Sequence, residues 1–391
     1  MQHIRGLIRP GFLAALCVAA ALGLAACGSS GSSASSAAST TTSTANESGG
    51  GGSEAAVTVD QKAAKAAGFP NYDSFKPPKF QAPAGARLAF LMPETVVPLQ
   101  RSIIEGVEAA AARDGAEVKV FDAGGYVNVS KQVGQMETAI GEGFDAIMML
   151  PASPAALNAQ ITAAKKAGIV VTADLIPPES EDLSFALYDS LPFEGETGAT
   201  ALAEAIGGEG EIYGLFGGEG SAPNIYYVEG ALKALKKFPK VKMVFREDFP
   251  AFNAAEAQTA TENAVAAHPD VKGVLTNSTS LVSGVQRALT TAGKSSVPTV
   301  GIGPNTKAEL EELRSEEIVT ATTAPFFKSG ELITEWTLAI LAGKQPKEQL
   351  LAMPPMVITP DNLEEAISSG ALYQALTPTQ LGCGPGQSEE C

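Results

Sequence analysis

Runs of consecutive apolar residues alternate with segments of helical periodicity over most of the chain. Residues 145–150 read Asp-Ala-Ile-Met-Met-Leu, an apolar run typical of a strand that is buried on both faces. Apolar residues then recur at helical spacing up to Gly168, and residues 169–173 form a second apolar run. This pattern predicts a βαβ unit with two parallel strands and a right-handed connection.

The same alternation continues on both sides of this unit. Strands are expected at residues 87–92, 118–121, 145–150, 169–173, 185–188, 211–216, 241–245, 273–276, 299–302 and 318–322. Helices are expected at residues 98–112, 129–140, 156–167, 194–206, 224–237, 253–267, 281–291, 307–314 and 326–341. Such alternation is typical of parallel sheets covered by helices. Because the region is too long for a single core, we predict an α/β fold with two lobes.

The first 26 residues have the features of a secretory signal peptide. Arg5 and Arg9 precede an apolar run at residues 12–24 that is too short to predict a membrane span. Its end, Leu24-Ala-Ala-Cys27, resembles the lipobox of bacterial lipoproteins, which implies cleavage before Cys27 and acylation of its thiol. An ordinary cleavage site that precedes a cysteine is the alternative. Residues 27–83 are expected to form a tether, because Ser, Thr, Ala and Gly dominate its first half and cannot support a core. Near its end, the aromatic residues Phe69, Tyr72, Phe75 and Phe80 are expected to pin an extended segment to the surface of the domain.

Two further cysteines, Cys383 and Cys391, flank a Gly- and Pro-rich turn near the end of the chain. In an exported protein we expect them to form a disulfide. A metal site is the alternative, but two thiolates without a nearby histidine are too few ligands, so no metal is expected. The chain has 27 Lys and Arg residues against 43 Asp and Glu residues, a net charge of −16. This acidity argues against nucleic acid or anionic lipid as a partner.

The sequence offers few groups for catalysis. Of its two histidines, His3 lies in the signal peptide and His268 precedes a proline at a helix end, where a capping role is expected. The segment Gly293-Lys-Ser lacks the upstream glycine of a phosphate-binding loop, because that position is Ala288. We therefore expect neither an enzyme nor a bound cofactor.

Seven segments carry a resemblance that extends over the whole folded region. They are residues 104–106, 145–151, 167–174, 267–274, Asn277, 288–293 and 300–303. In order and spacing they resemble the type I periplasmic solute-binding proteins of ABC importers, in the ribose- and xylose-binding group. The resemblance implies two Rossmann-like lobes with parallel sheets, joined by a hinge of three crossings near Asp189, Ala324 and Leu350. It assigns residues 84–189 and 325–349 to the N-terminal lobe, 190–324 and 350–360 to the C-terminal lobe, and 361–391 to a tail.

The resemblance also implies a sugar in the cleft between the lobes, near Asp174 and Asn277, which match the family's cleft aspartate and asparagine. Other family positions depart from the pattern. The arginine after the aspartate is Leu175, the helix arginine falls at Tyr227, the second aspartate at Gly303, the crossing glutamine at Pro325, and the aromatic pair at Leu99 and Gln100. Most charge-assisted hydrogen bonds to sugar hydroxyls are therefore absent from these positions.

A buried hydroxyl without a partner costs about 1–3 kcal/mol, so several such losses argue against tight binding of a simple sugar. Either other residues hold the sugar, or the ligand is less polar. Tyr226, Tyr227 and Phe326 are candidate walls for an aromatic or partly apolar ligand, because their rings offer flat apolar surfaces. For Tyr226 and Phe326, a position in the helix core is an equal alternative.

These features predict an exported, monomeric binding protein, anchored by lipid on the outer face of the cytoplasmic membrane. It is expected to capture a small solute and deliver it to the permease subunits of an ABC importer. The solute is a sugar by resemblance, or a less polar or aromatic compound. A ligand sensor for a membrane signalling protein is one alternative function. A secreted enzyme is another, disfavoured by the lack of histidines and metal ligands.

Replacing Cys27 by Ser is expected to release the protein from membranes, because this thiol is the predicted point of lipid attachment. Cell fractionation should recover Cys27→Ser in the soluble fraction and the wild-type protein with the membranes. Cys17→Ser, which lies upstream of the predicted cleavage site, is the control and should behave like wild type. A Cys27→Ser protein that stays membrane-bound would contradict the lipoprotein prediction.

Overall fold

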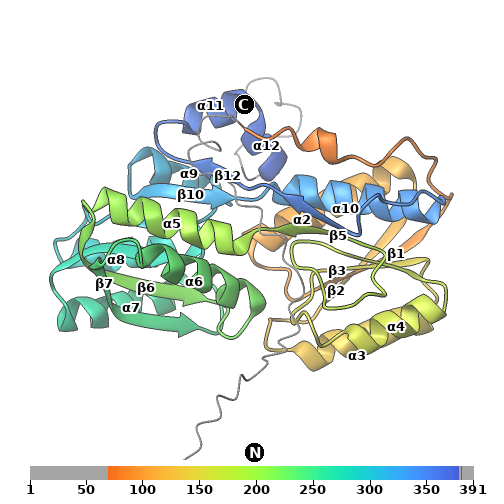
Figure 1. Ribbon diagram of the computed structural model, residues 1–391, viewed down its shortest axis with the longest axis horizontal. Coiled ribbons are helices and arrows are strands. Elements are labelled where there is room, and N and C mark those ends of the chain that lie inside the picture. The colour runs from red at the N-terminus through yellow and green to blue at the C-terminus, as the bar shows by residue number, and fades with distance from the viewer. Residues whose placement is uncertain (1–68, 378–379, 381–391) are drawn as a thin grey trace, which may run out of the picture. The chain divides into compact units, whose positions relative to one another are not determined.

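The described residues form two six-stranded sheets, each covered by helices on both faces (Figure 1). The structure is a computed structural model, and it describes residues 69–377 and residue 380. All strand pairs are parallel except the one between β10 and β12. The α/β fold with two lobes that the hydrophobic pattern predicts is confirmed.

The first lobe is built on a sheet with the strand order β11-β5-β4-β3-β1-β2. Its strands are β1 (Arg87–Met92), β2 (Glu117–Asp122), β3 (Ala146–Met149), β4 (Val170–Ala173), β5 (Phe185–Asp189) and β11 (Leu350–Met353). Its covering helices are α2 (Pro98–Asp114), α3 (Val129–Gly141), α4 (Asn158–Lys166) and α10 (Phe326–Leu341). Alternate residues of β1 point to opposite faces: Phe90 packs in the core shared with α2 and α10, and Leu91 in the core shared with α3 and α4.

The second lobe repeats this plan with the strand order β12-β10-β9-β8-β6-β7. Its strands are β6 (Glu209–Gly217), β7 (Lys240–Phe249), β8 (Val271–Thr276), β9 (Thr299–Ile302), β10 (Ile318–Thr323) and β12 (Met356–Ile358). Its helices are α5 (Leu191–Ala205), α6 (Ala222–Leu235), α7 (Ala254–Ala267), α8 (Val282–Thr291) and α9 (Lys307–Arg314). Helices α5 and α6 supply one core, and α7 and α8 supply the core on the opposite face of the sheet.

The chain passes between the two sheets three times: after β5, after β10, and between β11 and β12. The third passage lies later than the expected position near Leu350, because β11 still pairs with β5 of the first sheet. Residues 350–353 therefore belong to the first lobe, and the expected assignment of 350–360 to the second lobe is wrong at its start. The chain reaches the second sheet only at β12, which pairs with β10.

Part of the expected tether is folded onto the first lobe and the hinge. The short helix η1 (Tyr72–Phe75) places Tyr72 in the core, where its hydroxyl donates a hydrogen bond of 2.8 Å to the carbonyl of Pro354. The indole N–H of Trp336 donates to the carbonyl of Phe75 at 2.9 Å, and Lys328 forms an ion pair with Asp73. The segment 69–83 (orange in Figure 1) is thus anchored on α10 and beside the third crossing.

The expected tail also begins with folded structure. Helices α11 (Leu363–Ser368) and α12 (Ala371–Ala375) bury several apolar side chains, among them Leu363 and Leu372. The hydroxyl of Ser102 on α2 donates to the carbonyl of Ala375 at 3.3 Å. Helix α12 therefore packs on the first lobe, whereas Glu364 of α11 forms an ion pair with Arg314 of α9 in the second lobe. Residues 363–376 are part of the domain, and Cys383 and Cys391 lie outside the described residues.

Each lobe contains a pair of helices that approach closely at glycines. In the first lobe, a Cβ atom at Gly106 of α2 would lie 1.9 Å from the carbonyl oxygen of Phe327, and one at Gly330 of α10 would lie 2.1 Å from that of Ile103. In the second lobe, Gly195 of α5 and Gly230 of α6 likewise leave no room for a Cβ atom, because the backbone of the facing helix is too close. The close crossing of these helices requires residues without side chains, as at other tight backbone contacts.

Gly106→Ala is expected to destabilise the protein by about 2 kcal/mol, because the added methyl group must displace the backbone of α10. Urea unfolding of the full-length protein measures this free energy. Gly134→Ala is the matched control: Gly134 also lies in a helix, but a Cβ atom there meets no atom within 4 Å. The control should be stabilised by roughly 0.5–1 kcal/mol, since Ala favours helices. Equal effects of the two substitutions would contradict the packing argument.

Candidate functional site

A pocket lies where strands of both sheets end. It is lined by residues that follow β2, β4, β7 and β8, by the last residues of β5 and β9, and by the N-terminal ends of α2, α5, α6 and α10. The lining residues are Val97, Leu99, Gln100, Tyr126, Leu175, Asp189, Leu191, Glu194, Pro223, Phe252, Asn277, Ser278, Ile302 and Phe326. The carboxyl ends of parallel strands are the usual place for ligands in such folds. The empty space at this pocket is about 520 Å³, a figure that includes the part open to solvent.

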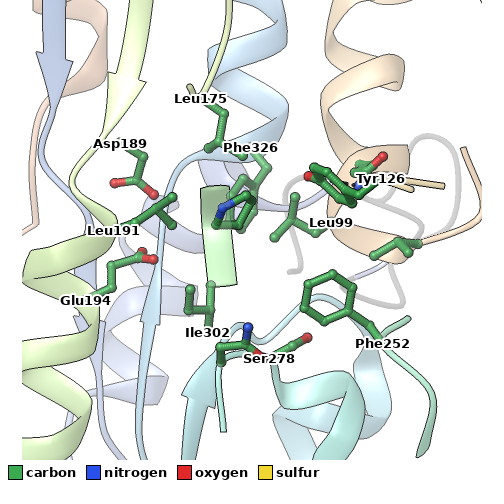
Figure 2. Close-up of a pocket in the computed structure, with 14 residues that line it drawn as sticks. Leu99, Tyr126, Leu175, Asp189, Leu191, Glu194, Phe252, Ser278, Ile302 and Phe326 are labelled. Carbon is green, nitrogen blue, oxygen red and sulfur yellow. Dashed lines mark hydrogen bonds between the residues drawn. The ribbon is translucent and has the colours of Figure 1, made fainter. Parts of the chain in front are cut away.

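Most of the lining is apolar, and three aromatic rings contribute to it. Figure 2 shows Tyr126 and Phe252 on the side of the pocket opposite Asp189 and Glu194, with Leu99 and Phe326 between. None of the fourteen lining residues is Lys or Arg. The pocket therefore offers apolar and aromatic surface together with carboxyl, amide and hydroxyl groups, and no positive charge.

Five residues named from the sequence line the pocket: Leu99, Gln100, Leu175, Asn277 and Phe326. The two amides are already bound to the protein. Asn277 accepts a hydrogen bond from the Gly217 N–H at 2.8 Å and donates to the Gly217 carbonyl at 2.9 Å. Gln100 accepts from the Glu94 N–H and donates to the Tyr126 hydroxyl at 3.3 Å. These amides hold the pocket walls in place, and their contact with a ligand stays a prediction.

Asp174 does not line the pocket, in contrast to the expectation from its position after β4. Its buried carboxylate accepts hydrogen bonds from the Leu175 N–H and from the Ser329 hydroxyl, each at 3.0 Å. Burial raises the pKa of Asp174 to about 7, against the lowering effect of these two bonds. The next residue explains the orientation: Leu175 has a φ of 66°, an uncommon turn conformation that brings its own side chain to the pocket and its N–H to the carboxylate. Asp174 thus joins β4 to α10.

Four other predicted residues lie outside the pocket lining. Tyr227 is buried in the second lobe, 6.2 Å from the Phe216 ring centre, because α6 turns this face toward α5. Tyr226 is half-buried and packs against the same core. Gly303 has a φ of 148° and lies against Thr279, and Pro325 is the N-cap residue of α10. Helix packing, not ligand contact, accounts for the two tyrosines.

Two carboxylates that sequence reasoning did not assign to the site line the pocket at the first crossing. Asp189 is the last residue of β5, and Glu194 lies in the first turn of α5. Their side chains are buried, and none of their four oxygen atoms accepts a hydrogen bond from any side chain other than the neighbouring carboxyl of the pair. The signal available in the sequence was the placement of two acids within six residues at a strand-to-helix junction.

Burial dominates the electrostatics of this pair. It raises the pKa of Asp189 to about 7, although the neighbouring Glu194 carboxyl and the Ser190 N–H lower it. Burial also raises the pKa of Glu194, and the nearby Asp189 carboxylate adds to this effect. Two carboxyl groups can hydrogen-bond to each other only through a shared proton. The pair therefore holds a proton near neutral pH more readily than exposed acids do.

The described part of the chain contains no group of three His, Cys, Asp or Glu side chains that could hold a metal ion. Among residues 69–377 and 380, no helix is long and apolar enough to cross a membrane. Cys27, Cys383 and Cys391 lie outside the described residues, so the lipid anchor and the disulfide stay predictions.

Comparison with known proteins gives one family. The model of the periplasmic binding protein domain matches residues 88–345. The xylitol-binding protein of Mycolicibacterium smegmatis is 27% identical over 267 residues, which are 67% of this chain and 74% of the relative. The ribose import binding protein of Bacillus subtilis is 24% identical over 286 residues, or 71% of this chain and 91% of the relative.

Solved structures agree on the fold. A periplasmic solute-binding protein of an ABC transporter from Actinobacillus succinogenes, with bound D-allose, superimposes with a TM-score of 0.67 at 22% identity. The match covers 72% of this chain and 99% of that protein. The relatives named here are binding proteins and not enzymes, in agreement with the expectation that this chain is not an enzyme.

Stability is expected to decrease between about pH 4 and pH 7, because the folded state keeps the Asp189 proton up to about pH 7 while the unfolded chain loses it near pH 3.8. The protonated Asp189 side chain stabilises the folded state fully at a pH below its unfolded pKa. This stabilisation is lost as the pH rises through the folded pKa. Asp189→Asn removes the charge and should raise the free energy of unfolding by about 1–3 kcal/mol at pH 7.5, and flatten its pH dependence. Urea unfolding across this pH range measures both effects.

Asp182→Asn is the matched control. Lys165 and Thr162 lower the pKa of Asp182 by hydrogen bonding, so loss of this carboxylate should reduce stability at neutral pH. If Asp189→Asn reduces stability in the same way, the Asp189 carboxylate has a stabilising partner and the burial argument is wrong.

Proposed function

Since this chain belongs to the periplasmic binding protein domain family, we propose that it is the solute receptor of an ABC importer. In this proposal it captures a small solute in the pocket between its lobes and delivers it to the permease subunits. The observation that carries the proposal is the pocket, because strand-end residues of both lobes line it together. Closure of two lobes around a ligand is an established motion for such architectures.

The relatives suggest a polyhydroxylated solute. Their names specify xylitol and ribose, and the matched structure holds D-allose. The pocket of this chain lies at strand ends, where ligands of such folds usually bind. Its lining contains Leu175, Leu191, Ile302 and three aromatic rings, which favour a compound with an apolar face over a fully hydroxylated one.

The proposed location is extracytoplasmic, with a lipid on Cys27 holding the protein at the outer face of the cytoplasmic membrane. The family and the signal-peptide features of residues 1–26 support this location. The receptor acts as a monomer, with the permease as its protein partner.

A ligand that binds only the folded protein should raise its melting temperature by several degrees at saturating concentration. The test is a thermal-shift screen of the full-length protein, purified in detergent, with sugars, polyols, nucleosides, aromatic acids and amines. Leu99→Trp should abolish the shift, because the added ring occupies the pocket that Leu99 lines. Val96→Trp is the control: Val96 is 83% exposed and lies outside the pocket, so the shift should remain. Failure of every compound class to stabilise the protein would overturn the proposed function.

A further inference from the structure

The Asp189 and Glu194 carboxyl groups differ from the other deeply buried acids of the described chain. Asp174 accepts hydrogen bonds from the Leu175 N–H and the Ser329 hydroxyl. Glu309 accepts from the Asn305 N–H and from the Ser280 hydroxyl. By contrast, the four oxygen atoms of Asp189 and Glu194 are buried with no side-chain donor outside the pair; the two carboxyls can only share a proton with each other, and the Ser190 N–H is the one backbone donor beside them. Buried polar groups normally have partners, so this pair has unused capacity to accept hydrogen bonds.

This unused capacity faces the pocket. Both residues line it, although Asp189 is only 8% exposed and Glu194 is fully buried. Figure 2 shows their carboxyl groups on the same side of the pocket, with Leu191 beside them. Because each of the four oxygen atoms is buried, a ligand group reaches them only when the surrounding side chains, Leu191 among them, move aside.

No positive charge among residues 69–377 compensates the pair. The pocket lining contains no Lys or Arg, and Lys328 of α10 is held by Asp73 and Glu331. The titratable groups that act on the pair from the surrounding elements are Tyr72 of η1, Tyr227 of α6 and Asp174 after β4. All three are acidic or phenolic, so none supplies a cation.

Resting on the proposed receptor function, we infer that the solute carries a protonated amine, which binds between the Asp189 and Glu194 carboxyl groups. A buried carboxylate is costly unless it is paired with a cation and hydrogen-bonded. An ammonium group supplies both the charge and up to three N–H donors. A neutral polyol would supply donors but leave the negative charge buried without a counter-charge.

The remaining walls define the rest of the solute. Leu99, Leu191, Ile302 and Phe326 give an apolar surface, and the rings of Tyr126 and Phe252 close the opposite side. Such walls suit a carbon skeleton with few hydroxyl groups. A metal ion is a poor alternative occupant, because Ca²⁺ takes six to eight oxygen ligands and the pair offers at most four.

The test compares amines with the alcohols of the same skeleton. Isothermal titration calorimetry on the full-length protein in detergent uses cyclohexylamine against cyclohexanol, benzylamine against benzyl alcohol, and glucosamine against glucose. At least one amine should bind ten-fold or more tightly than its alcohol. Its affinity should rise between pH 5 and pH 7.5, as the carboxyl pair gives up its proton to bind the cation.

Glu194→Gln and Asp189→Asn should each lower the affinity for that amine at least ten-fold and remove the preference over the alcohol. Both substitutions preserve side-chain size, and thermal unfolding verifies that the variants are folded. Asp182→Asn, an acid outside the pocket, should leave the affinity unchanged.

The inference would be overturned if amine and alcohol bound equally, or if no amine bound. It would also be overturned if the variants kept the preference for the amine, or if Ca²⁺ stabilised the protein and amines did not. Binding of glucose, ribose or xylitol in place of the amines would overturn the amine inference alone, because the receptor function would still be supported. Lack of response to all amines, sugars and polyols would count against both.

Discussion

Parallel pairing of the strands is the constraint on which the rest of this structure depends. Each parallel connection needs a crossover, here a helix in most cases, and the crossovers cover both faces of each sheet. All strands of a lobe then end at the same edge. Because the chain passes between the sheets three times, the two edges face one pocket, and residues 100 or more positions apart in the sequence line it together.

The first crossing joins the two lobes and also places carboxyl groups at the pocket. The strand β5 ends at Asp189, and α5 begins two residues later, so the first turn of the helix brings Glu194 back toward the strand end. A helix N-terminus favours a negative charge, which offsets part of the cost of burying Glu194 there. The offset is incomplete, as the raised pKa values of both carboxyl groups show. Asp189 and Glu194, at the first crossing, are thus also the pocket residues whose charged forms are the most unfavourable to bury.

Most of the fold was predictable, because its signals are local. The helices Lys307–Arg314 and Phe326–Leu341 begin and end where their apolar periodicity predicts, and the strand Arg87–Met92 follows its apolar run. Part of the site was predictable from strand ends, and Leu175 and Asn277 do reach the pocket. Glu194 and Asp189 were missed because acids are rarely buried. The orientation of Asp174 depends on the backbone of Leu175 and on Ser329, which lies 155 residues away in the sequence.

The anchoring of Tyr72 gives the N-terminal segment a mechanical role. Its hydroxyl holds Pro354 in the third crossing, while Asp73 holds Lys328 near the second. The segment 69–83 therefore contacts the chain beside two of the three crossings and not at the far end of either lobe. A contact beside a crossing has a short lever arm for any rotation of one lobe against the other. Such a rotation would therefore strain the Tyr72 and Asp73 contacts little.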